Sequence, residues 1–154
     1  MYAPILEMHL DKVTENARRL HRFCRERGVE VSFVSKGVSG LPEVIRAVRA
    51  GGIDSFADSR MKNIMAAKAA MPDLRYLLIR IPALDEAEEV VRWADWSLQS
   101  QIETIRAVSA AALRQGKVHP IVLMIDVGDL REGVFGMDQL EEIAPQIKAC
   151  KGVE

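Results

Sequence analysis

Short apolar runs alternate with segments of helical periodicity along the whole chain. The runs are rich in β-branched and aromatic residues, which favour strands. Between them, apolar residues recur three and four positions apart, which places them on one face of a helix. One face of the first predicted helix collects Val13, Ala17, Leu20 and Cys24. The pattern predicts strands at Ile5–His9, Glu30–Ser35, Ser55–Ala57, Tyr76–Ile81, Trp96–Leu98 and Ile121–Ile125.

Residues that start and stop helices support this alternation. Pro42 suits the first turn of a helix, and Gly51–Gly52 suits its end. Ser100 and Glu103 have the spacing of a capping box, so we expect Ser100 to accept a free N–H of the following helix. Gly116 is then expected to end that helix.

The order of these elements predicts an α/β fold with a parallel sheet, because a parallel connection must cross over the sheet. Two architectures fit, a doubly wound open sheet and a β/α barrel, and strand length does not separate them. A helical pattern over Leu140–Ala149 is followed by Gly152–Glu154, which resembles the approach to another strand. We therefore expect residues 1–154 to form one unit that stops partway through its repeat.

Composition and charge narrow the possible functions. Of the 154 residues, 49% are hydrophobic and 28% charged, as in an ordinary globular domain. The 21 basic and 22 acidic residues give a net charge of −1 and are spread evenly, so we expect no nucleic-acid partner. No apolar run approaches the length of a membrane span, and Cys24 and Cys150 make no disulfide framework. These features favour a cytoplasmic protein without a membrane partner.

Several common catalytic motifs are missing from the sequence. The chain contains neither a G-x-x-x-x-G-K-[ST] phosphate loop nor a G-x-G-x-x-G fingerprint, which argues against nucleotide hydrolysis and Rossmann-type redox chemistry. It also has no G-x-S-x-G elbow, which weakens an esterase interpretation. The histidines, His9, His21 and His119, lack the spacing of metal ligands, so no metal site is expected.

The candidate site is the set of polar residues at the predicted carboxyl ends of the strands, where sites form in parallel α/β folds. Lys36 closes an otherwise apolar run. A partly desolvated lysine becomes a nucleophilic amine that can form a Schiff base with an aldehyde. The alternative is that Lys36 simply extends its ammonium into solvent.

Other strand ends carry further candidates with open alternatives. Arg131, between Gly128 and Gly133, could clamp a carboxylate or a phenolate, or pair with a neighbouring acid. Asp58 and Arg60, which flank Ser59, could pair with each other or cap the next helix. Arg80 either ends its strand or points into a polar barrel mouth.

Four segments together resemble the alanine/ornithine racemase family, enzymes that use pyridoxal 5'-phosphate (PLP) and are built on a fold type III β/α barrel. They are Val34–Gly40, Phe56–Arg60, Leu77–Pro82 and Met124–Gly133. The resemblance runs through the whole chain and corresponds to the N-terminal portion of the family. It implies a partial (β/α)8 barrel of the TIM type with about the first five to six βα units.

This resemblance also implies chemistry for the candidate residues. Lys36 would form the Schiff base with PLP and transfer a proton at the substrate Cα. Arg131 would approach the phenolic oxygen of the cofactor and the carboxylate of the substrate. Arg80 and Ser59 complete the set of candidate cofactor-binding residues. A small amino acid is the implied substrate, and a homodimer is the implied form of the full-length protein.

Two positions depart from the alanine racemase pattern. Gly40 stands where alanine racemases carry a tyrosine, and Met124 stands where they carry a lysine. The Asp-Leu-Arg-Glu-Gly sequence at 129–133 looks closer to ornithine-type racemases. These departures leave the PLP assignment in place but leave ornithine, lysine and alanine open as substrates.

Three functions therefore compete. The first is a PLP-dependent amino-acid racemase, with little or no activity in this chain alone because the family's second acid/base lies beyond residue 154. The second is a non-catalytic PLP-binding or homeostasis protein on the same barrel. The third is a doubly wound signalling or binding domain that does not bind PLP.

Overall fold

The structure, a computed structural model, describes residues 5–154. Its main sheet contains five parallel strands, β1 (Ser32–Val34), β2 (Ser55–Asp58), β3 (Arg75–Leu78), β4 (Trp96–Gln99) and β5 (Ile121–Leu123). The helices are α1 (Leu10–Arg25), α2 (Pro42–Ala50), α3 (Met61–Ala70), α4 (Ala87–Trp93), α5 (Ile102–Arg114) and α6 (Gly136–Ala149). Two 3-10 turns, η1 (Ser35–Val38) and η2 (Leu84–Glu86), follow β1 and β3. The predicted alternation of parallel strands and helices is confirmed.

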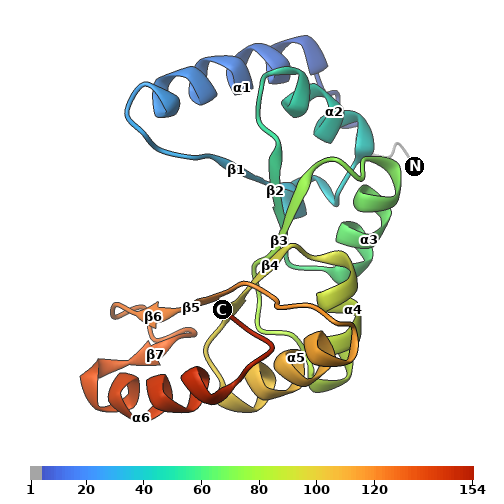
Figure 1. Cartoon of the computed structure of the whole chain (residues 1–154). Helices are drawn as coiled ribbons and strands as arrows, with labels where there is room; N and C mark the ends of the chain where they lie inside the picture. Colours follow the sequence, from blue (N-terminus) through green and yellow to red (C-terminus); the bar gives the residue numbers. More distant parts are fainter. Residues whose placement is uncertain (1–4) are drawn as a thin grey trace.

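The strand order separates the two architectures that the sequence left open. The strands lie side by side in sequence order, β1 to β5, each parallel to its neighbour. In a doubly wound sheet the order of the strands reverses at a switch point. In a barrel each new strand is added beside the previous one on the same side, and the sheet curves round to close on itself. Figure 1 shows the resulting open arc, with the helices along its outer side. The fold is part of a β/α barrel.

The core lies between the sheet and these outer helices. Phe33, Phe56 and Tyr76 stand at paired positions on three neighbouring strands. Their ring centroids are 6.0 Å and 6.3 Å apart, the second and third rings being almost fully buried. Ile45 of α2 and Ile64 of α3 are buried in the same cluster. Aromatic rings at these separations add packing energy to the burial of their area, so this ladder anchors the first three βα units.

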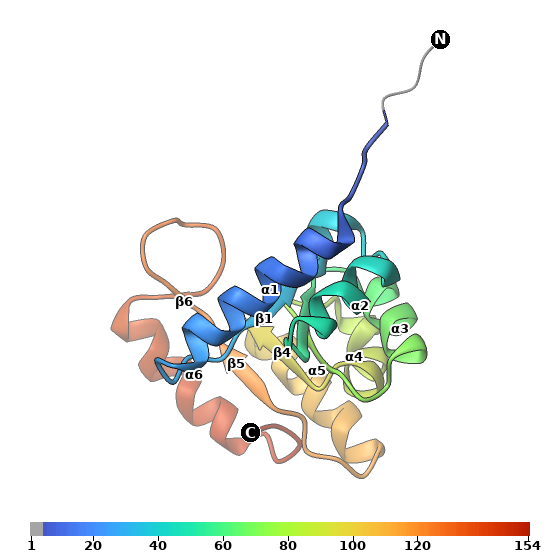
Figure 2. The same ribbon diagram turned by 90° about the horizontal axis from the view of Figure 1, so that it is seen from above.

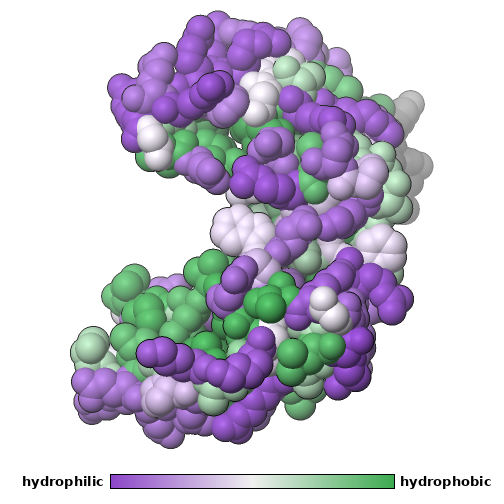
Figure 3. All heavy atoms as spheres, in the orientation of Figure 1, coloured by the Kyte–Doolittle hydropathy of each residue, from purple (hydrophilic) through white to green (hydrophobic). Residues whose placement is uncertain are grey.

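Alternate strand residues face the inner, concave side of the arc. This set includes Val34 of β1 and Val122 of β5, whose exposed fractions are 42% and 40%. Figure 3 shows the concavity as an open hollow between the two arms of the molecule. In a complete barrel, side chains from opposite strands fill this space. The inner apolar face is therefore open in residues 5–154, as a partial barrel predicts.

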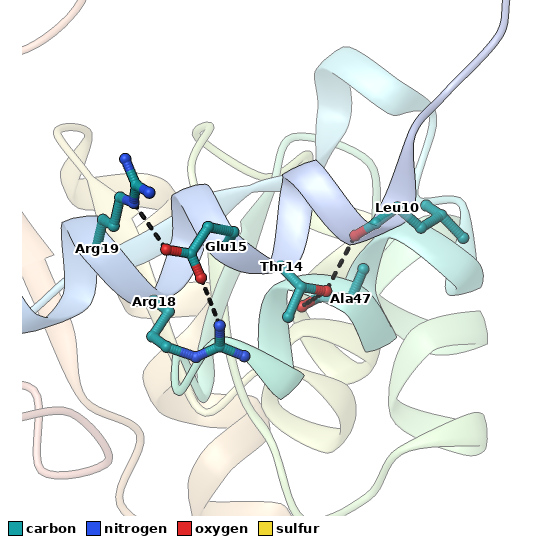
Figure 4. A network of polar contacts seen from close by, with 6 residues as sticks. All are labelled: Leu10, Thr14, Glu15, Arg18, Arg19 and Ala47. Carbon is teal, nitrogen blue, oxygen red and sulfur yellow. Dashed lines mark hydrogen bonds and ion pairs between the residues drawn. The ribbon is translucent and has the colours of Figure 1, made fainter.

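Helix α1 docks on α2 at a glycine. A Cβ on Gly51 would lie 2.5 Å from Ala17 Cβ and 2.8 Å from the Arg18 backbone nitrogen, so only glycine allows this approach. Thr14 Oγ1 donates to the carbonyl oxygens of Leu10 and Ala47, each at 3.0 Å (Figure 4). Pro42 begins α2 and Gly51 follows its last residue, both as predicted.

Two sequence predictions about local structure are wrong. Ile5–His9 is not a strand: the segment projects from the body (Figure 2), with Ile5 94% exposed. Its apolar residues match a strand pattern, but an extended segment becomes a strand only where a partner supplies hydrogen bonds. Ser100 does not cap α5, because Gln101 is the residue before that helix. Instead Thr104 Oγ1 donates to the carbonyl of Gln101 at 2.9 Å.

The predicted strand Ile121–Ile125 is divided because the chain changes partner at Met124. Its backbone N–H donates to the carbonyl of Gln99 at 2.8 Å, whereas its carbonyl accepts from Val134 at 2.8 Å. Beyond it, β6 (Ile125–Asp126) pairs with β7 (Val134–Phe135), a short strand that the sequence pattern did not predict.

The expected start of another strand at Gly152–Glu154 is confirmed. Val153 pairs in parallel with His119, and Ile121 N–H donates to the carbonyl of Glu154 at 2.8 Å. A Cβ on Gly152 would lie 2.1 Å from the carbonyl oxygen of Ser109, so glycine is required where this segment crosses α5. The segment thus lies beside the outer edge of β5, continuing the order of the sheet.

Candidate functional site

Lys36 lies in η1, directly after the carboxyl end of β1, as its position in the sequence pattern predicts. Its side chain is exposed in this structure. The desolvation expected from its apolar strand is therefore not provided by the described residues, because the concave side of the arc is open. A Cβ on Gly37 would meet nothing within 4 Å, so the space beside this turn is also open. An accessible primary amine at a strand end is the group that an aldehyde cofactor needs.

The turn that carries Lys36 is held by the preceding residue. Ser35 is buried, and its hydroxyl donates to Asp58 Oδ2 at 2.7 Å and to the carbonyl of Ala57 at 3.2 Å. Asp58, only 2% exposed, also accepts from the Arg60 backbone N–H at 2.9 Å and from Asn63 Nδ2 at 3.2 Å. Asp58 therefore ties η1 to the start of α3. Asp58 does not cap α3, whose N-cap residue Arg60 has no side-chain cap hydrogen bond, and it forms no ion pair with Arg60, so neither of the two roles that the sequence left open for Asp58 is observed in the described residues.

The turn after Lys36 explains one departure from the alanine racemase pattern. Gly40 has a φ of +68°, a left-handed conformation that favours glycine. A Cβ at this position would lie 3.0 Å from Asn63 Cβ, closer than ordinary van der Waals contact. A bulky side chain at this position would have to displace Asn63, which also binds Asp58. Gly40 thus belongs to the same packed unit as the Ser35–Asp58 contact.

Arg80 and Ser59, both predicted to bind cofactor, are brought together. Arg80 Nε donates to the carbonyl of Ser59 at 2.7 Å, and Nη1 donates to the carbonyl of Ile81 at 3.1 Å. Nη2 donates to Glu86 Oε1 at 2.5 Å. Arg80 lies beyond β3, which ends at Leu78, so of its two possible positions the strand end is the one observed. Its guanidinium is fixed against the loop by these three contacts.

Glu86 holds Arg80 and also shapes its own turn. Its second oxygen accepts from the Ala83 backbone N–H at 2.8 Å. The hydrogen bond from Arg80 lowers the pKa of Glu86 below its usual value, although burial opposes this shift. The carboxylate is therefore ionised at neutral pH, and the pair rigidifies the loop between β3 and α4.

Replacing this carboxylate should loosen the loop measurably. We expect Glu86→Gln to lower the unfolding free energy by about 1 kcal/mol, since it removes a charge-assisted hydrogen bond that is partly screened by solvent. Urea unfolding at neutral pH measures the change, with Glu89→Gln, an exposed residue on α4, as the matched control. Equal effects of the two substitutions would show that the Arg80 contact contributes nothing specific.

Arg131 lies in the exposed loop between β6 and β7. Asp126 organises this loop: its Oδ1 accepts from the backbone N–H of Gly128 at 2.8 Å and of Leu130 at 3.2 Å. These bonds, with that of Gly128 the strongest, lower the pKa of Asp126. Gly133 has a φ of +129°, and a Cβ there would lie 2.6 Å from the Asp126 backbone nitrogen. The conformation of the loop thus depends on the hydrogen bonds accepted by Asp126 and on glycine at position 133.

The structure does not link every predicted site residue. In residues 5–154 no hydrogen bond or ion pair joins the side chain of Lys36 or Arg131 to another residue. The ion pair considered for Arg131 with a neighbouring acid is not formed. Ser35 and Asn63, which hold the turn of Lys36, were not among the predicted site residues. The signal for Asn63 was its spacing: it follows Asp58, at the end of a predicted strand, by five positions and lies in the first turn of the next helix, within reach of that carboxylate.

The fold and these strand ends define a class: a partial β/α barrel whose polar rim presents a lysine after its first strand. The chain belongs to the family described as alanine racemase, N-terminal domain, whose model matches residues 8–154. The family resemblance stated from the sequence is confirmed. This family, together with the PLP-bound structure described below, points to pyridoxal 5'-phosphate as the cofactor.

Two curated relatives share one third of their aligned residues with this chain. One is the ornithine racemase of Acetoanaerobium sticklandii, 33% identical over 153 residues that cover 98% of this chain. Another is the lysine racemase of Thermotoga maritima, 33% identical over 152 residues that cover 99% of this chain. The chain spans 42% of the length of each of these relatives.

Solved structures support the barrel assignment. D-threonine aldolase from Filomicrobium marinum has a TM-score of 0.84 at 17% identity, covering 99% of this chain and 42% of that one. PipY of Synechococcus elongatus with PLP bound has a TM-score of 0.76 at 22% identity, covering 90% of this chain and 66% of that one. At these identities the likeness shows the fold alone. Within residues 5–154, no helix is long and apolar enough to cross a membrane.

Proposed function

We propose that this chain supplies the cofactor-binding lysine of a PLP-dependent amino-acid racemase, and that Lys36 is that lysine. The observation that carries the proposal is the position of Lys36 in the turn after β1 of an alanine racemase-type barrel. The residues fit the cofactor: an accessible amine suits its aldehyde, and the guanidinium groups of Arg80 and Arg131 suit anionic oxygens. Ser59 adds a hydroxyl at the same rim.

The chain's own residues then have separate tasks. When bound, PLP supplies the electron sink that makes the substrate Cα proton acidic. Lys36 holds the cofactor and afterwards removes or returns the proton on one face of Cα. Arg131 binds the carboxylate of the amino acid and the phenolic oxygen of the cofactor. The Ser35–Asp58 contact fixes the backbone from which Lys36 projects.

Racemisation also needs an acid/base on the opposite face of Cα. We propose that this group comes from polypeptide outside residues 5–154. The proposal is supported by the greater length of the racemase relatives, of which this chain spans 42%. The complete enzyme is proposed to be a cytoplasmic homodimer acting on ornithine or lysine, the substrates named for those relatives. Alanine remains an alternative substrate.

Reductive trapping tests the lysine assignment. Incubation with PLP, reduction with borohydride and peptide mapping should place the phosphopyridoxyl label on Lys36, because its amine lies at the rim. Lys36→Arg should abolish at least nine tenths of the label, whereas Lys62→Arg, an exposed lysine on α3, should leave it unchanged. A label spread evenly over the lysines, or retained in Lys36→Arg, would refute the assignment.

Turnover assays separate racemisation from cofactor binding alone. Residues 1–154 alone should convert L-ornithine, L-lysine or L-alanine to the D-isomer slowly or not at all, because the second acid/base is proposed to lie in other polypeptide. A protein extended to the length of the curated relatives should racemise one of them. Trapping at Lys36 without turnover in the extended protein would favour the alternative function, a non-catalytic PLP-binding protein.

A further inference from the structure

A stripe of basic residues runs along the second half of α1, away from the proposed PLP site. Arg18, His21, Arg22 and Arg25 are spaced three and four residues apart, so they share one face of the helix. Figure 3 shows hydrophilic surface over this helix, in the upper arm of the molecule. The stripe adjoins the contacts that dock α1 on α2, in which Thr14, Ala17 and the Arg18 backbone take part.

This stripe lines a hollow rather than a flat surface. The hollow has a volume of about 470 Å³ and is lined by Arg18, His21, Arg22, Arg25, Glu26 and Gly51. The adjoining Gly52 has a φ of +100°, and a Cβ there would lie 2.4 Å from His21 Nδ1. Glycine at position 52 therefore leaves room for the His21 ring. We call this hollow the basic groove.

The charges in the basic groove are unbalanced. Three arginines line it against one carboxylate, that of Glu26. Glu15, outside the groove, accepts from Arg18 at 2.5 Å and from Arg19 at 2.7 Å, so its charge is shared between two guanidinium groups (Figure 4). In the described residues no ion pair engages the side chain of Arg22 or Arg25. The groove thus holds two guanidinium groups with free donors.

A helix dipole alone does not account for this arrangement. Basic residues near a helix C-terminus are stabilising, and this explains Arg22 and Arg25 in the last turn of α1. It does not explain Arg18, which lies two turns earlier, or the hollow that these side chains line. Several guanidinium groups that line one hollow are suited to phosphate oxygens, which they bind through paired hydrogen bonds.

We propose that the basic groove binds a small anion with two or more linked phosphoryl groups. Arg18 to Arg25 spans about 10 Å along the helix axis, at about 1.5 Å per residue, which is too long for one phosphate and suits a chain of them. Gly51–Gly52 precede β2, whereas Lys36 follows β1. Because the strands are parallel, the groove lies at the opposite end of the sheet from Lys36. It is a second site, independent of the cofactor.

Calorimetric titration with pyrophosphate tests this site. Wild-type protein should show saturable binding at a single site, and the double substitution Arg22→Gln/Arg25→Gln should weaken it at least tenfold. The matched control is Arg106→Gln/Arg114→Gln, which removes the same charge from α5, where these residues contact Gln146 and Glu88. The control should bind within twofold of wild type.

Two readouts distinguish a site from general charge attraction. Pyrophosphate should shift the backbone amide resonances of Gly51 and Gly52 in wild-type protein. Inorganic phosphate should bind at least tenfold more weakly at the same ionic strength, because it reaches fewer guanidinium groups. The proposal is overturned if wild-type protein shows no saturable binding. It is equally overturned if the α5 control loses as much affinity as the groove variant, or if phosphate binds as well as pyrophosphate.

Discussion

Substitution of Asp58 by alanine should lower the unfolding free energy by about 2–4 kcal/mol, because it strips partners from several buried donors. The carboxylate accepts from the Ser35 hydroxyl, the Asn63 side-chain amide and the Arg60 backbone N–H. In Asp58→Ala the amide of Asn63 and the N–H of Arg60 lose their acceptor. Unfolding by urea at neutral pH measures the loss.

Two comparison variants sharpen this test. Asp58→Asn keeps one acceptor oxygen and the approximate shape, so it should cost less than the alanine substitution. Asp73→Ala removes an exposed carboxylate that pairs with Arg49 on the surface, and should cost less than about 1 kcal/mol. If Asp58→Ala lowered the unfolding free energy no more than Asp73→Ala does, the hydrogen bonds of Asp58 at the end of β2 would not stabilise the fold.

The same substitution should reach the proposed cofactor site. Ser35 precedes Lys36 in η1, and its hydroxyl is bound to Asp58. Loss of this contact frees the turn, so we expect a lower yield of reductive label on Lys36 even under conditions where the variant stays folded. An unchanged yield would indicate that the amine needs no positioning by Asp58.

The sequence predicted the repeated parts of this molecule well, because they depend on local periodicity. Pro42 and Gly51 bound α2 as expected, and Gly152–Glu154 begins a further strand beside β5. Lys36 could be proposed as a site residue because a cation that closes an apolar run is visible in the sequence itself. Its role still rests on the family resemblance, since the run alone fits a solvated lysine equally well.

The errors arise where tertiary partners decide the outcome. Ile5–His9 has a strand-like composition, but no neighbouring strand meets it in the described chain. β7 was not predicted, because Val134–Phe135 is too short to show a period and forms only where Met124 brings β6 beside it. The Ser35–Asp58 contact joins residues 23 positions apart, a distance over which no sequence pattern operates.

A buried polar chain between β4, β5 and α5 was also missed. Thr104 Oγ1 donates to Gln99 Oε1 at 2.9 Å, and Gln99 Nε2 donates to Ser97 Oγ at 3.0 Å. Ser97 Oγ is in turn 3.1 Å from His119 Nε2. The sequence signal was the alternation of Ser97 and Gln99, which places both side chains on the face of β4 that meets the helices.

This chain of contacts makes His119 a source of acid sensitivity. His119 is 3% exposed, and burial lowers its pKa from 6.5 to about 4, with Lys117 adding to the effect and Asp95 opposing it. The folded protein therefore takes up a proton on His119 less readily than the unfolded chain does. Above pH 6.5 both states are neutral at this residue, so it has no effect on stability there. Below that pH the unfolded state gains the proton first and is favoured.

We expect the unfolding free energy to fall by about 2–3 kcal/mol between pH 6.5 and pH 4.5, since each pKa unit corresponds to about 1.4 kcal/mol. The lowered pKa of Glu86 adds a smaller loss of the same sign near the acid end of this window, because the unfolded chain protonates this carboxyl first. The share of the histidine is therefore the difference in slope between wild type and a variant without the imidazole. Urea unfolding at several pH values measures the slope.

A non-titrating side chain at position 119 should flatten this dependence. His119→Gln keeps a group that can bind Ser97 Oγ, so the variant should fold, and its stability should change by less than about 1 kcal/mol over the same window. His9→Gln, at an exposed position, should retain the wild-type slope. Because the backbone of His119 pairs with Gly152–Glu154, the same acid step should expose the amides of that pairing to faster hydrogen exchange. Equal pH slopes in wild type and His119→Gln would mean that this imidazole accepts a proton in place, and that the buried chain tolerates the charge.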